Sequence, residues 1–595
     1  MTEHGAEPDS RRPRIASLWR RHRARWTLPL VIIVIIGAVA IVDHLGSHRI
    51  SQVDRQSTTA LVAAKGGTAT VELDRPWAGF NPNTPAGAAS STPTLLTSVL
   101  PSAYVVNQKL IPEVNSDLLS SVEATSTSPL TIQYVINPKA VWSDGVPVTA
   151  DDFIYAWQSQ RGGWLDVDGH PDQVASTLGY RAVASITSSN GGKTVTVKFA
   201  TPYTDWRDMF DHMVPAHVAR RVGWNHGFDT FTPAVDLSAG PYVVQSVSPT
   251  GTALLVRNEK WWGTPAVLDG VTVNVAGDQN TWANVLSANN HAVAQPTAFD
   301  LGTLNRVSSL PNTQSLIKPS LNILQLEFNV TSPVLVRAGR EAIAHAIDRT
   351  ALLAHTFGSI DPELVINQDH LAAVGQSSYS ASSAAGEYSE PDLETMDRLL
   401  RSIGFHQNVL GNYVDAGGRQ LTVRMAVESG DPWIGTVATE ISAQLRAVGI
   451  AVVTTAVAGR AGMVAAAAAN SYDMALVTRT AGPYQTATAS WYSDGEGPVG
   501  TTGTQDWSKF DGPEVDQLFA QASQALDPVT GGTIYSQIDD QLWDQMVALP
   551  LFGEPGLLAS GVQLDGQQYN PTPDGILWNV PLWTLLKPGP TSARS

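Results

Sequence analysis

The chain has 595 residues, of which 43% are hydrophobic and 15% charged, with a formal net charge of −17 and no cysteine. The lack of cysteine excludes disulfides, thiol catalysis, thiolate metal sites and lipid attachment through cysteine. The negative charge argues against nucleic acid as a partner of the main body.

The N-terminal segment has the pattern of a membrane anchor. Seven arginines lie within the first 25 residues, and the run 27–42 that follows carries no charge. An uncharged run flanked by arginine on one side predicts a single pass through the cell membrane with the body outside the cytoplasm. A cleaved signal peptide is the alternative, because residues 38–40 (AVA) fit a cleavage site. We therefore expect a cytoplasmic tail over 1–26, an anchor over 27–45 and a stalk with weak helical character over 46–67.

The first half of the body reads as mainly β-structure. The run 68–73 alternates as a strand does, and 183–202 reads as two strands around Asn190-Gly191-Gly192, which is a hairpin signal. A strand over 130–138 leads into "AVWSDGVPVTADDFIYAW" (140–157). There a Ser-Asp-Gly turn precedes Thr149, which with Asp152 predicts a capping box at the start of a helix.

The second half alternates helices with strands, so the predicted fold class is α/β. Gly449 is expected to cap the C-terminal end of the helix that starts near Gly435, and a strand follows it. Further along the chain, an Ala-rich helix leads into a second strand over 474–477. Helices are expected within the segments 332–357, 435–448, 461–470, 512–526 and 535–552, and the one over 461–470 is Ala-rich.

Catalytic and metal-binding patterns are weak. His212 and His217 have no third ligand in the pattern, so we expect surface or helix-face positions and no metal. A Gly-x-Gly-x-x-Gly spacing that ends at Gly500 predicts a loop, since no helix pattern follows it. The acid pairs 151–152 and 539–540 are interpreted as helix caps or solvated faces. The sequence thus predicts a non-enzymatic binding protein without cofactors.

After the turn and helix start at 140–157, eight short motifs follow in order. They are LSAGPYVVQSV (237–247), RNEKWWG (257–263), FNVTSP (328–333), REAIAHAIDR (340–349), ISAQLRAVGI (441–450), YDMALV (472–477), DGPEVDQL (511–518) and LPLF (549–552). Together with the stretch 140–157, which resembles the family signature, they resemble the family 5 extracytoplasmic solute-binding proteins, which serve peptide and nickel ABC importers.

The resemblance implies a two-lobe periplasmic-binding-protein-like fold of type II, in the large peptide-binding class. It implies a discontinuous lobe I over 68–320 and 551–588 and a lobe II over 321–550. Two chain crossings, near 324–329 and near Pro550, would form the hinge around a ligand cleft.

The resemblance also places candidate ligand contacts at the cleft: Trp77, Phe80, Asn81, Asn329, Arg479, Tyr484, Trp491 and Tyr492. Core packing is the alternative for each aromatic residue, and Asn329 can instead satisfy backbone groups. In peptide-binding relatives an acid after the YDMALV strand grips the α-amino group, but no acid occurs between Asp473 and Asp494. With Arg479 there instead, we expect an anionic or amphipathic ligand, unless an acid reaches the cleft from the first lobe.

Two functions remain open at this point. The first is an anchored receptor that passes a small-molecule or peptide ligand to an ABC permease. The second is similar to actinobacterial proteins of this fold that regulate assembly of phosphatidylinositol mannosides and lipoarabinomannan without transport.

Overall fold

The computed structural model describes residues 49–50, 61–361, 364–493 and 505–588. The chain divides into two units, Met1–Arg49 and Ile50–Ser595, with the short strand β1 (Arg49–Ile50) at their boundary. The predicted tail and anchor lie outside the described residues, as does the glycine-rich loop around Gly497. Among the residues that are described, no helix is long and apolar enough to cross a membrane.

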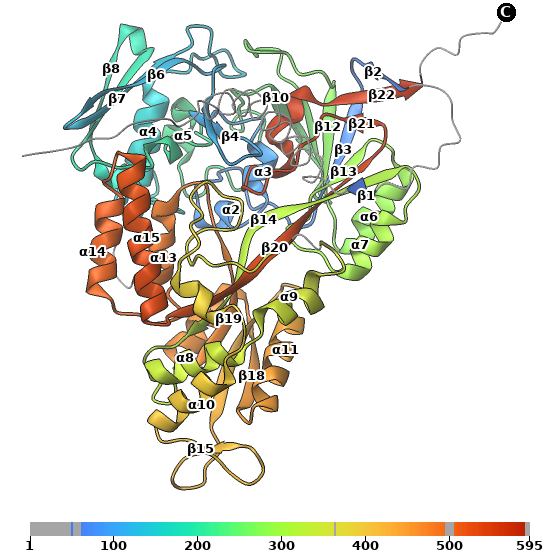
Figure 1. The fold of residues 1–595 in the computed structure, drawn as a ribbon. Helices are drawn as coiled ribbons and strands as arrows, with labels where there is room; N and C mark the ends of the chain where they lie inside the picture. The colour runs from blue at the N-terminus through green and yellow to red at the C-terminus, as the bar shows by residue number, and fades with distance from the viewer. Residues whose placement is uncertain (1–48, 51–60, 362–363, 494–504, 589–595) are drawn as a thin grey trace, which may run out of the picture. The chain divides into compact units, whose positions relative to one another are not determined.

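One large mixed sheet forms the framework of the second unit (Figure 1). Its strands β3, β12 and β13 pair in parallel, as do β17, β18 and β19 further along the sheet. In spatial order the strands are β10 (Tyr242–Val247), β11 (Ala253–Arg257), β12 (Gly270–Val275), β3 (Thr68–Leu73), β13 (Ala292–Ala294), β20 (Ala548–Gly561), β14 (Thr313–Phe328), β19 (Met474–Thr480), β17 (Thr422–Ser429) and β18 (Ala451–Ala458).

The long strands β14 and β20 connect the two halves of this sheet. They pair antiparallel from Thr313 opposite Gly561 to Glu327 opposite Ala548, with register irregularities near Pro319 and Leu324. The chain crossings predicted near 324–329 and Pro550 fall on or directly beside these two strands. A bending region on two adjacent, irregular strands suits hinge motion.

We call the first lobe the elements that pack on the core around Val71, Phe153, Phe210 and Leu577. A four-stranded antiparallel sheet and several short helices complete it. They are α2 (Pro85–Ala88), α3 (Thr92–Leu96), β4 (Tyr104–Val106), β5 (Pro112–Val114), β6 (Leu119–Thr127), β7 (Leu130–Ile136), α4 (Ala150–Gln160), η1 (Tyr180–Ala182), β8 (Val183–Ser189), η2 (Asn190–Gly192), β9 (Thr194–Phe199), η3 (Trp206–Asp208), α5 (Ala216–Val222), β21 (Leu564–Asp565), η6 (Gly575–Leu582) and β22 (Thr584–Pro588).

The predicted turn and helix start at 140–157 are confirmed. Gly145 has a φ of +93°, and the Asp144 carboxylate accepts from the backbone N–H of Val146 at 3.0 Å. Thr149 caps α4 in a capping box with Asp152, whose other oxygen accepts from the backbone of Ala216 at 3.0 Å. The predicted hairpin is also confirmed as β8 and β9. The stalk differs: β2 (Leu61–Ala64) is a strand that pairs with β22, a partner that local propensity cannot reveal.

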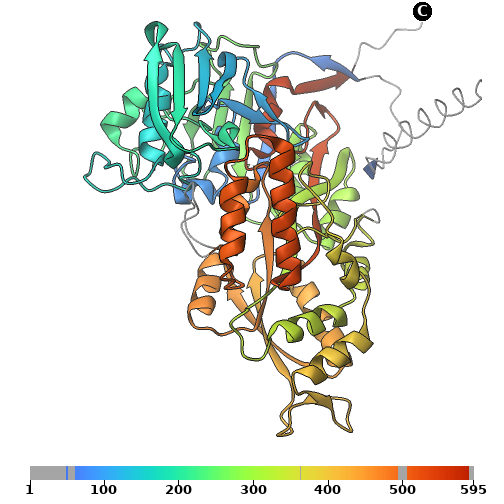
Figure 2. The same ribbon diagram turned by 60° about the vertical axis from the view of Figure 1, so that its left-hand side comes forward.

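We call the second lobe the elements from α8 to α15 together with β17 to β19. The predicted helix-then-strand units are confirmed as α11–β18 and α12–β19. Helices α14 and α15 lie side by side (Figure 2). The helices and short strands of this lobe are α8 (Arg337–Ala346), α9 (Arg349–Phe357), η4 (Ala384–Tyr388), α10 (Leu393–Ser402), β15 (His406–Gln407), β16 (Tyr413–Val414), α11 (Ile434–Ala447), α12 (Gly459–Ala468), η5 (Gln485–Thr488), α13 (Ala489–Tyr492), α14 (Pro513–Ala522) and α15 (Pro528–Asp544). Outside this lobe, α6 (Gln279–Ala288) packs against β13 and α7 (Leu301–Ser308) packs against β14.

The prediction of a cap or solvated position for Asp539 is wrong. Asp539 lies within α15 and is 3% exposed. Its Oδ1 accepts from the backbone N–H of His370 at 2.8 Å and lies 2.7 Å from the His370 Nδ1. The loop that carries His370 covers this face of α15, so a position that looks polar in the helix pattern is buried.

Candidate functional site

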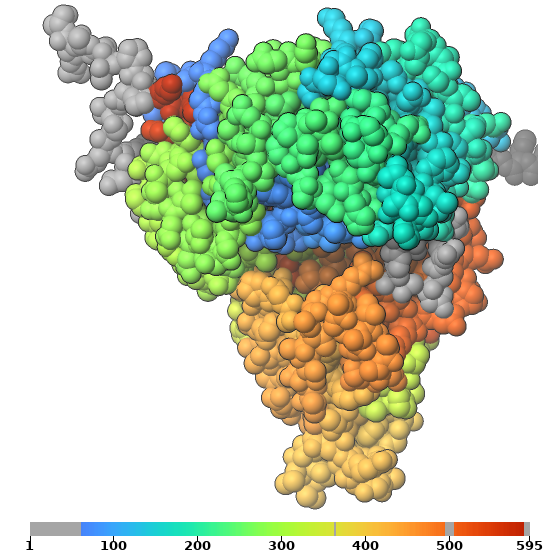
Figure 3. Space-filling model, turned by 180° about the vertical axis from the view of Figure 1, so that it is seen from behind, coloured from blue at the N-terminus to red at the C-terminus, as the bar shows by residue number. Residues whose placement is uncertain are grey.

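Several cavities lie between the lobes, and two of them, named cavity A and cavity B, adjoin each other. A third, of about 750 Å³, shares Arg207 and Pro483 with the lining of cavity A. On the face seen in Figure 3, a groove separates the segments coloured blue to green from those coloured orange. Cavity A has a volume of about 310 Å³ and cavity B about 480 Å³, and they share Leu321 and Pro571 in their linings. Cavity A is lined by Tyr104, Val106, Arg207–Met209, Asp211, Leu321, Thr480–Tyr484, Ala487 and Pro571–Asp574.

Direct hydrogen bonds join the two lobes beside cavity A. From the first lobe, Thr204 donates through its backbone N–H to Ser523 and through its hydroxyl to Ala525, both at 2.8 Å. From the second lobe, the Thr486 backbone N–H donates to the Asp205 carboxylate at 3.0 Å. The Tyr484 hydroxyl donates to the Arg207 carbonyl at 3.1 Å. The lobes therefore adopt a closed arrangement in which polar groups from both sides are paired.

Among the predicted contacts on the second lobe, Tyr484 lines cavity A. The Trp491 and Tyr492 side chains belong to a buried core at 5% and 0% exposure. The Tyr492 hydroxyl donates to the Gln325 side chain at 2.6 Å. Segment 480–484 therefore lines the cavity, while Trp491 and Tyr492 pack in the second-lobe core and do not line it.

Arg479 has its donors committed inside the second lobe. Its Nε donates to the Glu327 carboxylate at 2.5 Å, and its Nη2 donates to the Gln505 carbonyl at 2.7 Å. The guanidinium carbon lies 5.6 Å from the Trp491 ring and 5.9 Å from the Trp507 ring. Burial raises the pKa of Glu327 to about 7, even though Arg479 acts in the opposite direction. Arg479 is 2% exposed and does not line cavity A or cavity B.

The predicted contacts nearer the N-terminus also lie outside these two linings. Trp77 packs against the core of the first lobe, and the ring centroids of Phe80 and Phe231 are 5.5 Å apart. The Asn81 side chain donates to the carbonyl of Trp224 at 3.3 Å. Asn329 is fully buried and donates to the carbonyl of Tyr472 at 3.0 Å, which is the backbone-satisfying alternative.

Acidic groups reach cavity A from the first lobe. Asp208 ends η3, Asp211 follows it in the next segment, and Asp574 precedes η6. The second-lobe segment 480–487 contributes no acid. The acid that the sequence lacks after β19 is thus supplied by the opposite wall, and Arg207 is the cationic residue of the lining.

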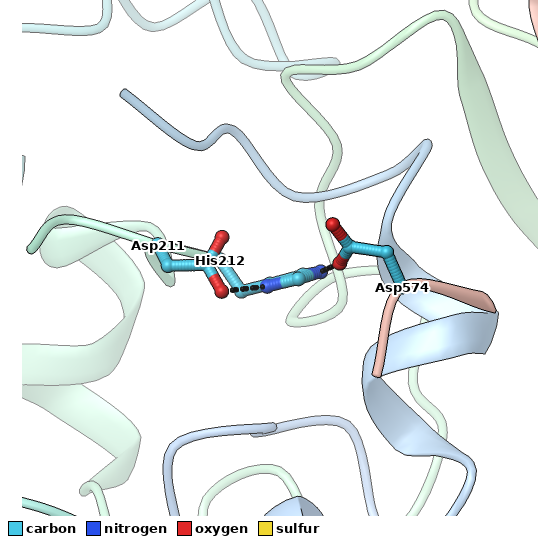
Figure 4. Close-up of side chains that lie close together, drawn as sticks. All are labelled: Asp211, His212 and Asp574. Carbon is cyan, nitrogen blue, oxygen red and sulfur yellow. Dashed lines mark ion pairs between the residues drawn. The ribbon is translucent and has the colours of Figure 1, made fainter. Parts of the chain in front are cut away.

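Asp211, His212 and Asp574 form a cluster at this wall, with the imidazole between the two carboxylates (Figure 4). His212 Nδ1 lies 2.8 Å from Asp211 Oδ2, and Nε2 lies 3.4 Å from Asp574 Oδ1. The predicted surface or helix-face position of His212 is wrong: it is 2% exposed and precedes α5. Its place follows from a tertiary contact with a residue far along the chain.

The protonation of this cluster follows from burial and neighbouring charge. Burial alone would lower the pKa of His212, but Asp211, Asp574 and the backbone carbonyl of Pro93 outweigh it and raise that pKa to about 9. Burial raises the pKa of Asp574 above its ordinary value. The imidazole is therefore a cation at neutral pH when nothing else is bound.

The segment that carries these groups has a backbone signal that only the structure reveals. Phe210 and His212 have φ angles of +62° and +43°, which non-glycine residues rarely adopt. Sequence reasoning missed Arg207, Asp208, Asp211 and Asp574. The acid-rich run 205–211 was the available signal, but its pairing with 571–574 depends on tertiary structure.

Comparisons with known proteins agree with this architecture. The family model described as "Bacterial extracellular solute-binding proteins, family 5 Middle" matches residues 113–500. The oligopeptide-binding protein OppA of Mycobacterium tuberculosis is 27% identical over 491 residues, covering 80% of this chain and 77% of OppA. The probable monoacyl phosphatidylinositol tetramannoside-binding protein LpqW of the same organism is 26% identical over 412 residues, covering 63% of this chain and 62% of LpqW.

The fold is similar to that of solved structures. The periplasmic EDTA-binding protein EppA superposes with a TM-score of 0.79 at 24% identity, covering 90% of this chain and 99% of EppA. The two-lobe periplasmic-binding-protein fold is therefore confirmed. Since the family model spans more than half of the sequence, this chain belongs to the bacterial extracellular solute-binding proteins of family 5.

Proposed function

We propose that this protein is an extracytoplasmic solute receptor that closes on a peptide or related small ligand and presents it to an ABC permease. The observation that carries the proposal is the pair of cavities between the lobes, bordered by hydrogen bonds that exist only when the lobes meet. A ligand that contacts both linings would stabilise this closed arrangement. The likeness to OppA, whose name states oligopeptide binding, supports a peptide as the ligand.

The charges of cavity A favour a ligand with a positive group. Three carboxylates, those of Asp208, Asp211 and Asp574, border the cavity together with Arg207, whereas Arg479 is held by Glu327. Because the His212 cation already faces Asp211 and Asp574, Asp208 is the carboxylate that we assign to a ligand ammonium group, which needs such a partner when it leaves water. A free peptide amine is therefore the candidate that we test, in place of the anionic ligand expected from Arg479.

The second candidate is regulation of envelope glycolipid assembly without transport. The likeness to LpqW supports it, since the name of that protein states binding of a phosphatidylinositol tetramannoside. We rank this candidate second because LpqW matches 63% of this chain, whereas OppA matches 80%.

We also propose that residues 27–45 anchor the protein and leave residues 68–588 outside the cytoplasm. The uncharged run with arginine on one flank supports this orientation, as does a family described as extracellular. Protease added to intact spheroplasts should digest the body and spare the first 26 residues. Digestion of the tail with survival of the body would reverse the assignment.

Calorimetry with a mixed tri- to pentapeptide library, and with the same library acetylated at the amine, tests the receptor function. We expect micromolar or tighter binding of the free peptides, weaker binding of the acetylated ones, and compaction in small-angle scattering when peptide binds. The bound peptides should be recovered unchanged, because we infer no catalysis. Binding of mannosylated phosphatidylinositol without any peptide binding would favour the second candidate.

A further inference from the structure

One nitrogen of the buried His212 makes no hydrogen bond of ordinary geometry among the described residues, although the nearby Pro93 carbonyl favours the protonated ring. It is Nε2, which faces Asp574, while Nδ1 is engaged by Asp211. We propose that His212 Nε2 and the Asp574 carboxylate bind a divalent transition-metal ion such as Zn²⁺ at the wall of cavity A. Imidazole nitrogen combined with carboxylate oxygen suits Zn²⁺, Co²⁺ and Ni²⁺.

The spacing of the two donor atoms supports an ion between them. Nε2 and Oδ1 are 3.4 Å apart. A charge-assisted N–H···O bond would bring them to about 2.7–2.9 Å. Two ligands of one tetrahedral zinc ion, with bonds of about 2.0–2.2 Å, are instead separated by about 3.3–3.5 Å. The observed separation matches the second arrangement.

Asp211 acts as the outer partner of this site. Its carboxylate lies 2.8 Å from Nδ1, so it holds the proton on that nitrogen and turns the lone pair of Nε2 toward Asp574. A carboxylate behind a metal-binding histidine orients the ring and increases its basicity. The three residues therefore divide into two ligands, His212 and Asp574, and one positioning residue.

The two ligands are fixed independently of lobe closure. The His212 backbone N–H donates to Ser102 at 2.9 Å, and its carbonyl accepts from the Asn83 side chain at 3.0 Å. Beside Asp574, the Pro573 carbonyl accepts from the Thr94 hydroxyl at 2.7 Å. Both segments pack on the same first-lobe core, which limits the reorganisation that metal binding requires.

An ion here would have coordination positions left over, because the chain supplies two ligands. Asp574 lines cavity A, so water or a carboxylate of a bound solute can occupy them. The ion would replace the proton on His212 and make the wall less negative. The inference does not depend on the receptor function, since metal binding can be measured with no solute present.

Titration of metal-stripped full-length protein with ZnCl₂ tests the site, with binding measured by calorimetry. We expect His212→Gln to lose one bound zinc ion, Asp574→Asn to bind that ion at least tenfold more weakly, and Asp211→Asn about 10–100-fold more weakly. His217→Gln is the matched control, because His217 also pairs with an aspartate, at 2.9 Å, but on the surface. This control should bind as the wild type does.

Equal zinc stoichiometry and affinity in the wild type and His212→Gln would overturn the proposal and leave a proton as the occupant of Nε2. Circular dichroism melting checks that each variant folds. If His212→Gln fails to fold, anomalous scattering from zinc-soaked wild-type crystals decides: a peak between Nε2 and Asp574 supports the site, and its absence rejects it.

Discussion

Arg479 and His212 are both cationic side chains at 2% exposure, yet their surroundings differ. Arg479 donates to Glu327 and to the Gln505 carbonyl, and two tryptophan rings flank it. His212 is engaged at one nitrogen, while the other faces Asp574 without a hydrogen bond. A buried charge with all donors satisfied maintains the fold, whereas one with an unfilled position beside a cavity is available for binding. Five predictions test this contrast and the contacts between the lobes, from the largest expected effect to the smallest.

Removing the partner of Arg479 should cost the most. In Glu327→Gln the buried guanidinium loses the carboxylate that it donates to, while Asp506 and Glu428 act on it only at longer range, so we expect the free energy of unfolding to fall by about 3–5 kcal/mol. Urea unfolding measures this. The control is Asp544→Asn, which removes a surface ion pair with Arg337 in which the two side chains are 52% and 48% exposed. It should cost less than about 1 kcal/mol.

The double variant Glu327→Leu, Arg479→Met sharpens the first prediction. Replacing both charges by apolar groups should recover most of the loss, because no unpaired ion remains. Peptide affinity in this variant should match the wild type if Arg479 does not contact the ligand. If stability were restored but peptide affinity fell strongly, Arg479 would be shown to contribute to ligand binding.

Asp205→Ala tests the contacts between the lobes. Two groups of Thr486, its backbone N–H and its hydroxyl, donate to the Asp205 carboxylate. Their loss should shift the equilibrium toward the open form by about 1–2 kcal/mol. Small-angle scattering without ligand should show a larger radius of gyration. Asp229→Ala is the control, since Asp229 pairs only with the exposed His226; the same expansion there would contradict the assignment.

Tyr484→Phe should have a smaller effect of the same kind. It removes one hydrogen bond, to the Arg207 carbonyl, and keeps the ring at cavity A. We expect peptide affinity to fall by about fivefold, equivalent to about 1 kcal/mol. Calorimetry with the library peptide that binds most tightly measures it. Unchanged affinity would mean that the closed form does not depend on this contact.

Asp574→Asn should leave stability nearly unchanged in metal-free protein. The carboxylate lies 3.4 Å from His212 Nε2, which is long for a charge-assisted hydrogen bond, and it makes no capping hydrogen bond at η6. The variant therefore loses a weak ion pair, and its amide oxygen can keep the hydrogen bond with Thr97. We expect a change below about 1 kcal/mol in urea unfolding. A loss comparable to that of Glu327→Gln would show that the His212 cluster is a structural ion pair of the same kind as Arg479–Glu327.

The sequence by itself determined the local elements and the family. The capping box at Thr149, the hairpin before Phe199 and the α–β units after Ile434 follow from residue spacing over a few turns. Local spacing and backbone hydrogen bonding decide such features, so no distant partner is needed. The eight motifs likewise pointed to the family and its two-lobe fold, which the comparisons confirm.

Tertiary structure alone decided which side chains meet at the cleft. Asp574 reaches His212, and His370 covers Asp539, across separations that no periodicity records. Burial of Arg479 depends on Glu327 of the neighbouring strand β14, whose carboxylate accepts from the guanidinium. The sequence shows which side chains carry a charge. Whether such a charge has a hydrogen-bond or ion-pair partner depends on contacts between segments that are distant along the chain.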